Sequence, residues 1–373
     1  MKKFFLFFLL LLGVAPLVGA QSRQVVTQND NGIACTLPAT ALIIEVTVER
    51  MDSYPGPLAD YAGPLLGIQH PLRQRQTSYR ITGVALRDYV ISDLATFSRL
   101  HYSGEKSKEE QRSMVSLHTN GTLAGINMPG LSPSASPSFS YSLPEWSMKA
   151  PDYDLYLSCP SQVTVTDTLV QLVTLDGTTV RDVSYSQRVI AYQEADKAND
   201  FVDKIERIRS ERMNLLSGYQ EVAYPEGTLR YMDGEFQRME EAYLSLFRGV
   251  QTREEKVFTF FVIPEKQHLK KPLFVCGFSE SDGVSYSGRT AGKGIELHFH
   301  ADNIPEVSSP EVKGLTYRLP VAGSVVVHYV HEILGGGVFL FPQFGPVITV
   351  PASTHPSAMI DPKTGAATSI SMD

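Results

Sequence analysis

Three side chains in the last third of the chain have the types and the spacing of a metal site. Glu296, His298 and His300 stand at every second position. On a β-strand they share one face, with neighbouring side chains about 6.6–7 Å apart. Imidazole and carboxylate groups are common Zn²⁺ ligands. The pattern therefore predicts a candidate metal site, and its alternative is the solvated face of a strand whose other face buries the apolar residues in between.

The three cysteines are the next candidates for chemistry. Cys35, Cys159 and Cys276 are each more than a hundred residues from the next, and no Cys-x-x-Cys motif is present. An odd count permits at most one intramolecular disulfide, so the pairings 35–159, 35–276, 159–276 and none all stay open. Burial as small hydrophobic side chains is the favoured interpretation.

No set of catalytic residues is predicted. The chain has no Gly-x-Ser-x-Gly nucleophile motif. Gly335-Gly336-Gly337 lacks the Gly-Lys-Ser/Thr ending of a phosphate-binding loop, and we expect it to form a hairpin turn. Cys276 lies in an apolar segment, which favours burial over a reactive thiolate. No cofactor is predicted.

The first twenty residues have the order of a secretory signal peptide. Lys2 and Lys3 precede the apolar run Phe4–Leu12, and small residues end at Ala20. Cleavage is predicted after Ala20. The apolar run is shorter than the roughly 20 residues that a membrane span needs, and no second such run follows. We therefore expect no transmembrane span in the mature chain.

Charge argues against one class of partner. Of the 33 Lys and Arg residues, two lie in the signal segment, so the mature chain carries 31 basic and 40 acidic side chains, a formal charge of −9. The sequence contains no cluster of Lys and Arg residues that could contact a phosphate backbone, so nucleic acid is not an expected partner.

The elements that would position these residues are mostly strands. Apolar and polar residues alternate in Ala41–Glu49, which predicts a half-buried strand. Hairpins are predicted in Met114–Met128, turning at Asn120-Gly121, and in Leu169–Tyr185. Phe258–Val262 is a nearly continuous apolar run, which predicts a strand covered on both faces. Further strands are predicted at Leu273–Phe278, Gly294–His300, Leu315–Leu319, Gly323–Val330, Val338–Phe341 and Val347–Val350.

Two amphipathic helices form the other clear pattern. Apolar residues recur every three or four positions from Ala191 to Leu216, ahead of Gly218. A second stripe runs from Leu229 to Leu246 and ends at Gly249. The short connection predicts an antiparallel helical hairpin.

These elements predict an α+β, mostly β fold, with two β-sandwich-like or β-sheet domains and an antiparallel two-helix hairpin between them. The predicted divisions are a signal peptide (1–20), an N-terminal β region (21–129), a Ser/Pro-rich linker or loop (130–145), strands that continue the N-terminal domain (146–190), the helical hairpin (191–249) and a C-terminal β domain (256–373).

Short segments throughout the chain resemble a family of exported Bacteroidota proteins, the domain of unknown function 4831. They are Leu37-Pro38 before Ile43-Ile44-Glu45-Val46, Tyr54-Pro55-Gly56-Pro57 with Tyr61-Ala62 and Leu66-Gly67, Thr77-Ser78-Tyr79-Arg80-Ile81, Ile208-Arg209 with Leu215-Leu216-Ser217-Gly218, Glu241 with Tyr243-Leu244 and Leu246-Phe247-Arg248-Gly249, Tyr317-Arg318-Leu319-Pro320, Gln343-Phe344-Gly345, and Asp361-Pro362-Lys363-Thr364-Gly365. The resemblance implies export by a Gram-negative bacterium, to the periplasm or cell surface, and a β/α layout. It implies no activity and no site residues.

Three functions follow as hypotheses. We favour a non-enzymatic binding or structural component of a cell-envelope assembly with protein partners, because sheets and a long helical hairpin offer docking surface. The first alternative is an envelope hydrolase or metal-dependent enzyme that uses Glu296, His298 and His300. The second is a carbohydrate-binding protein, for which Trp146, the single Trp, is a weak stacking platform.

Overall fold

Most of the chain is built from β-strands, and the predicted α+β, mostly β class is confirmed. The computed structural model describes residues 32–101, 115–118, 121–127, 144–175, 178–218, 224–286, 288, 293–302, 304–306, 314–351, 356–361 and 363–372. The strands are β1 (Gly32–Tyr54), β2 (Gln76–His101), β3 (Val115–Leu117), β4 (Leu123–Ile126), β5 (Gln162–Leu175), β6 (Thr178–Ala191), β7 (Val250–Val262), β8 (Leu273–Ser279), β9 (Gly283–Ser285), β10 (Gly294–His300), β11 (Gly314–Arg318), β12 (Val321–Tyr329), β13 (Glu332–Phe341), β14 (Val347–Pro351), β15 (Pro356–Ile360) and β16 (Ala367–Met372). The helices are α1 (Ala62–Leu66), α3 (Asp154–Leu157), α4 (Glu194–Ser217) and α5 (Glu226–Arg248), with short 3-10 turns η1 (Ala59–Tyr61), η2 (Lys266–Leu269) and η3 (Pro342–Phe344).

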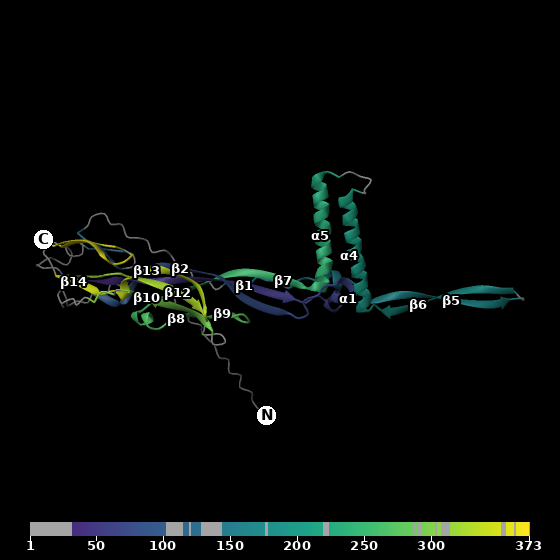
Figure 1. Cartoon of the computed structure of the whole chain (residues 1–373), viewed down its shortest axis with the longest axis horizontal. Helices are drawn as coiled ribbons and strands as arrows, with labels where there is room; N and C mark the ends of the chain where they lie inside the picture. Colours follow the sequence, from purple (N-terminus) through teal and green to yellow (C-terminus); the bar gives the residue numbers. More distant parts are fainter. Residues whose placement is uncertain are drawn as a thin grey trace, which may run out of the picture.

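Two five-stranded sheets pack against each other and form the body of the molecule (Figure 1). The first has the order β14-β11-β2-β1-β7, and the second the order β13-β12-β10-β8-β9. Alternation in β1 turns Ile44, Val46 and Val48 inward, where they are fully buried against the second sheet. A smaller sheet, β16-β15-β4-β3, has its own core around Ile126.

Strands from the N-terminal and the C-terminal parts of the chain share one sheet, which differs from the predicted two β domains divided at the helical hairpin. β1 lies between β2 and β7, and β11 from the C-terminal part pairs with β2. Pairing between strands so distant in sequence leaves no local signal, because it depends on which edges meet in the folded chain.

Strand β7 corrects one expectation. Phe258 and Phe260 are buried, but Val257 and Phe261, which alternate with them along the strand, are 49% and 39% exposed. β7 is the last strand of its sheet, and only one of its faces packs on the second sheet. The prediction that both faces of this strand are buried was therefore wrong.

The three consecutive glycines correct another. Gly335-Gly336-Gly337 lies within β13, opposite Val325–Val327, and the turn falls at Val330 and His331. A Cβ on Gly336 would lie 2.6 Å from the Val325 carbonyl oxygen, so this close approach of two strands requires glycine. A β-bulge follows at His328.

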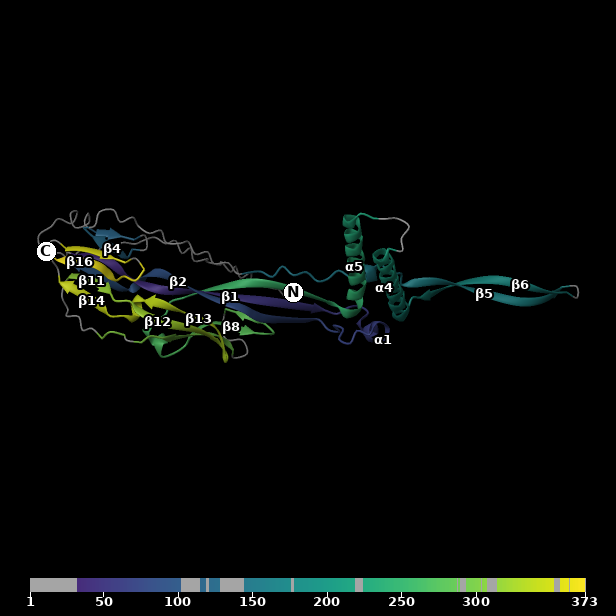
Figure 2. The same ribbon diagram turned by 45° about the horizontal axis from the view of Figure 1, so that its top comes forward.

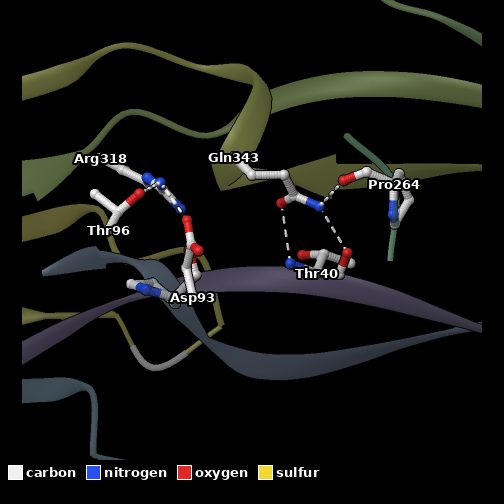
Figure 3. A network of polar contacts seen from close by, with 7 residues as sticks. Thr40, Asp93, Thr96, Pro264, Arg318 and Gln343 are labelled. Atoms are coloured by element: carbon white, nitrogen blue, oxygen red, sulfur yellow. Dashed lines mark hydrogen bonds and ion pairs between the residues drawn. The ribbon is translucent and has the colours of Figure 1, made fainter. Parts of the chain in front are cut away.

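Polar contacts hold β11 to β2 within the first sheet and η3 to β1 (Figure 3). The buried Arg318 guanidinium donates to Asp93 at 2.6 Å and to Thr96 at 2.9 Å. The Gln343 side chain bonds both the N–H (3.0 Å) and the carbonyl (2.7 Å) of Thr40 in β1. These bonds satisfy backbone groups and a charge that burial would otherwise leave unpaired.

The helical hairpin is present, and its base packs against α1. α4 ends at Gly218, which has the left-handed φ of +73°. Ion pairs Arg209–Glu240 and Arg212–Asp233, at 2.6 Å each, join the two helices.

Two details of the predicted α4 stripe were wrong. Ala191 belongs to β6, because α4 begins only at Glu194. Leu215 is buried in place of Leu216, which is 51% exposed.

Strands β5 and β6 form a separate ribbon rather than a continuation of the N-terminal sheets. Among the described residues they pair only with each other, in register over their whole length. Figures 1 and 2 show this ribbon extending along the long axis of the molecule, on the far side of the helices from the body.

Several predictions fall outside the described residues. These are the signal peptide with its cleavage after Ala20, Asn120 of the first hairpin, and nearly all of the Ser/Pro-rich stretch 130–145. In the described part of the chain, none of the helices combines the length and the apolar composition needed to span a bilayer.

Candidate functional site

The predicted strand-face residues do share a face of β10. Ile295, Leu297 and Phe299 are buried on the other face, as the alternation predicts. His298 Nε2 lies 3.9 Å from a Glu296 carboxylate oxygen. His300 instead approaches Asp302, at 3.1 Å, beyond the end of the strand.

One histidine of this cluster was missed. His328 on β12 lies directly opposite Glu296, and its ring centre is 4.4 Å from that of His298. The local sequence gives no sign of this neighbour, because the pairing of β10 with β12 joins segments that are far apart in the chain.

The metal site stays a prediction. Within the described ranges, no group of three or more His, Cys, Asp or Glu side chains is placed to hold an ion together. Metal content of the purified protein, and its loss on combining His298→Ala with His300→Ala, tests the hypothesis.

The three cysteines lie in three different apolar clusters and form no disulfide with one another. Cys276 is buried between the two large sheets, Cys35 lies in the core of the smaller sheet, and Cys159 packs at the base of the helices. Burial raises the pKa of the Cys276 thiol to about 12, so it is a thiol rather than a nucleophilic thiolate at neutral pH.

An open hollow of about 420 Å³ lies where the ends of the two large sheets meet. Glu49, Arg80, Arg253, Glu280 and Glu332 contribute its charges. Glu49 and Arg80, which face each other on β1 and β2, form an ion pair at 3.1 Å. Its described lining includes neither His nor Cys, so the hollow offers mixed charge and shape but no nucleophile with an adjacent imidazole base.

Trp146 is engaged in packing. Its ring lies 5.9 Å from Tyr79 and 6.0 Å from Phe258, and the Arg50 guanidinium lies 5.8 Å from its centre. Arg50 in turn makes two hydrogen bonds to the buried Asp52, at 3.0 and 2.9 Å. This arrangement ties the segment after residue 143 to the body, which is a structural role for the single Trp.

The β5–β6 ribbon carries several strongly exposed apolar side chains. Leu172 is 73% exposed, Tyr185 72% and Val189 62%. Every residue from Arg181 to Ala191 is exposed, so no described part of the chain covers either face of β6 over these residues. Such residues normally form the inner face of a packed sheet.

The ribbon also has two open edges. Among the residues that the structure describes, each strand of 14 residues pairs on one side only, and its outer N–H and C=O groups face away from the other strand. Isolated two-stranded ribbons are marginally stable, and open edges are sites for pairing with another strand. Runs of Val and Thr with few charges predict strands here. The local sequence does not indicate whether another layer of the protein covers these strands.

The ribbon carries few charges. An ion pair joins its strands, with Arg188 Nε 2.9 Å from an Asp167 oxygen. Arg181 and Asp182 lie farther along β6 toward the turn.

Comparison with known proteins identifies a family and no characterised relative. The model of the family described as "Domain of unknown function (DUF4831)" matches residues 31–366. No curated protein and no solved structure matches the chain.

Proposed function

Because the chain belongs to the "Domain of unknown function (DUF4831)" family, whose description names no activity, we propose its function from its own geometry. It is a non-enzymatic docking component of a protein assembly, exported to the envelope of a Gram-negative bacterium. The β5–β6 ribbon is its docking element.

The observation that carries this proposal is the exposure of apolar side chains on an unsupported ribbon with open edges. Burying one Val, Leu or aromatic side chain contributes about 1.5–3 kcal/mol, so a partner that covers several of them gains a substantial binding free energy. The backbone of an open edge adds directional hydrogen bonds, as in other strand-addition complexes.

The position of the ribbon supports the same role. It extends away from the body and beyond the helical hairpin, so a partner can reach its whole length (Figure 2). At about 3.3 Å per residue, 14 residues span about 46 Å.

A position-specific photo-crosslinker tests the docking role. Leu172 on the ribbon and Val338 on β13 of the body are both apolar and both 73% exposed. A benzophenone amino acid in place of Leu172 should give a discrete crosslinked product in the native envelope, and the same group in place of Val338 should not. Equal crosslinking at both positions, or none at Leu172, would contradict the proposal.

Export has its own test. The pattern of the first twenty residues predicts that the protein in the envelope fraction begins at Gln21. N-terminal sequencing checks this. A chain that retains Met1 and fractionates with the cytoplasm would overturn the proposed location.

A further inference from the structure

The occupant of the ribbon can be inferred from the outer edge of β6. In an antiparallel ladder, the N–H and C=O of successive residues point alternately to one side and the other. The residues of β6 whose backbone N–H and C=O point away from β5 therefore fall at every second position. When two copies of this edge pair about a two-fold axis, a residue whose backbone N–H and C=O point away from β5 must face another such residue. Because these residues alternate, the axis must lie at a residue that faces the same residue of the other copy.

One such register matches opposite charges. Asp182 and Arg188 lie three positions before and three positions after Tyr185. With the axis at Tyr185, Asp182 of each copy faces Arg188 of the other, which creates two ion pairs. Asp167 already lies 2.9 Å from Arg188, so each guanidinium would bridge two carboxylates.

The neighbouring registers lack this match. An axis at Asp182, at Arg181 or at Arg188 places like charges face to face, which is destabilising. Axes at the residues from Val183 to Gln187, other than Tyr185, put no acidic side chain of β6 opposite a basic one. The edge of β5 offers no alternative of this kind, because Asp167 is the only charged residue of that strand.

Pairing centred on Tyr185 also includes most of the residues of β6. Tyr185 lies near the middle of β6, so strand pairing would run from the base of one ribbon almost to its tip. The exposed Tyr185 rings would face each other across the axis, and aromatic pairs are favourable cross-strand neighbours. Both views show the ribbon extending clear of the sheets (Figures 1 and 2), so the two bodies would lie at opposite ends of a four-stranded ribbon.

We propose that a second copy of this chain occupies the β6 edge, in an antiparallel two-fold pairing centred on Tyr185. This inference rests on the proposed docking role of the ribbon and names its partner. The order of strands in the dimer is β5-β6-β6-β5.

Cysteine crosslinking of the purified mature chain tests the register. Tyr185→Cys places one thiol opposite its own copy at the axis, at a separation that a disulfide can bridge. Leu172→Cys is the matched control, because Leu172 is equally exposed on the same ribbon but lies on β5. Mild oxidation should give a covalent dimer with Tyr185→Cys and monomer with Leu172→Cys. Equal dimer yields from both variants would overturn the register.

A charge exchange tests the ion pairs. Asp182→Arg leaves only basic residues at the two facing positions, and Arg188→Asp leaves only acidic ones. Each variant alone should dimerise about tenfold or more weakly than the unaltered chain. An equimolar mixture should regain the original affinity, because both pairs reform between unlike chains. Sedimentation velocity measures the three dissociation constants, and failure of the mixture to recover would contradict the pairing.

The two proposals can fail separately. A purified chain that stays monomeric at its highest soluble concentration, and gives no dimer with Tyr185→Cys, overturns the second-copy inference. If the photo-crosslinker at Leu172 then yields a product with a different protein in the envelope, the docking role stands. If it yields none, both proposals fall.

Discussion

The sandwich body and the β5–β6 ribbon are built from the same kind of sequence and end in opposite environments. In β1, the apolar side chains Ile44, Val46 and Val48 are fully buried under the second sheet. In the ribbon, Leu172 and Tyr185 are more than 70% exposed. β-Branched and apolar residues therefore specify an extended strand, but they do not specify whether another layer of the same chain covers it.

The charges of the two regions differ in the same way. In the body, Arg318 and Asp93 form a nearly buried pair at 2.6 Å, and Arg318 also donates to the carbonyl of Pro38. On the ribbon, Arg188 and Asp167 form a solvent-exposed pair. The body thus has the buried and paired side chains of a protein core, whereas the ribbon has the exposed apolar side chains of a surface that binds a partner.

The largest contrast is expected from truncating apolar side chains. Ile44→Ala should lower the free energy of unfolding by about 4 kcal/mol, because it leaves a cavity in a packed core. Leu172→Ala should change it by less than about 0.5 kcal/mol, because the side chain is exposed. Urea unfolding of the dilute mature chain measures both values, and similar losses would show that the ribbon is packed in solution.

Removing one partner of each ion pair gives the next contrast. Asp93→Ala leaves the Arg318 guanidinium buried without its carboxylate and should cost about 3 kcal/mol. Asp167→Ala breaks an exposed pair and should cost less than about 1 kcal/mol. The same urea experiment measures both. A small effect of Asp93→Ala would mean that water reaches Arg318.

Acid should weaken the body through Asp52. Burial alone would raise the pKa of this carboxyl, but hydrogen bonds from Arg50 and Thr77, the Arg50 charge and a hydrogen bond from Tyr54 outweigh burial and lower it. A carboxyl whose pKa is lower in the folded state stabilises the fold above its unfolded pKa of about 4.

That stabilisation is lost as the pH falls through the lowered folded-state value. Asp52→Asn should therefore reduce stability at pH 7 and flatten its decline below about pH 4. Urea unfolding across this pH range checks the effect, and an unchanged slope in the variant would assign the acid sensitivity to other groups.

The smallest effect on stability is expected from removing the ribbon. The Tyr192 N–H donates to the Ser161 carbonyl at 2.9 Å, so the chain ends at the ribbon base are adjacent. Replacing residues 162–191 with a short Gly-Ser linker should shift the melting temperature of the body by no more than about 2 °C, because none of the ribbon side chains that the structure describes belongs to the three apolar clusters. The same deletion should abolish dimerisation. A large thermal shift would show that the ribbon is part of the folding unit.

Local pattern alone determined most of the elements of this protein. The alternation in Ala41–Glu49 and the stripe that ends at Gly218 identified β1 and α4, because side-chain periodicity follows directly from backbone geometry. The same rule put Glu296, His298 and His300 on one face of β10. The mostly β class followed from these elements.

Tertiary structure decided which elements meet. The pairing of β1 with β7, the position of His328 beside His298 and the strand position of Gly336 all depend on contacts between segments far apart in the chain. The exposure of the β5–β6 ribbon was decided in the same way, by the absence of a covering layer among the described residues. Periodicity describes what a strand presents on each face, whereas burial depends on what the rest of the fold, or a second molecule, places against it.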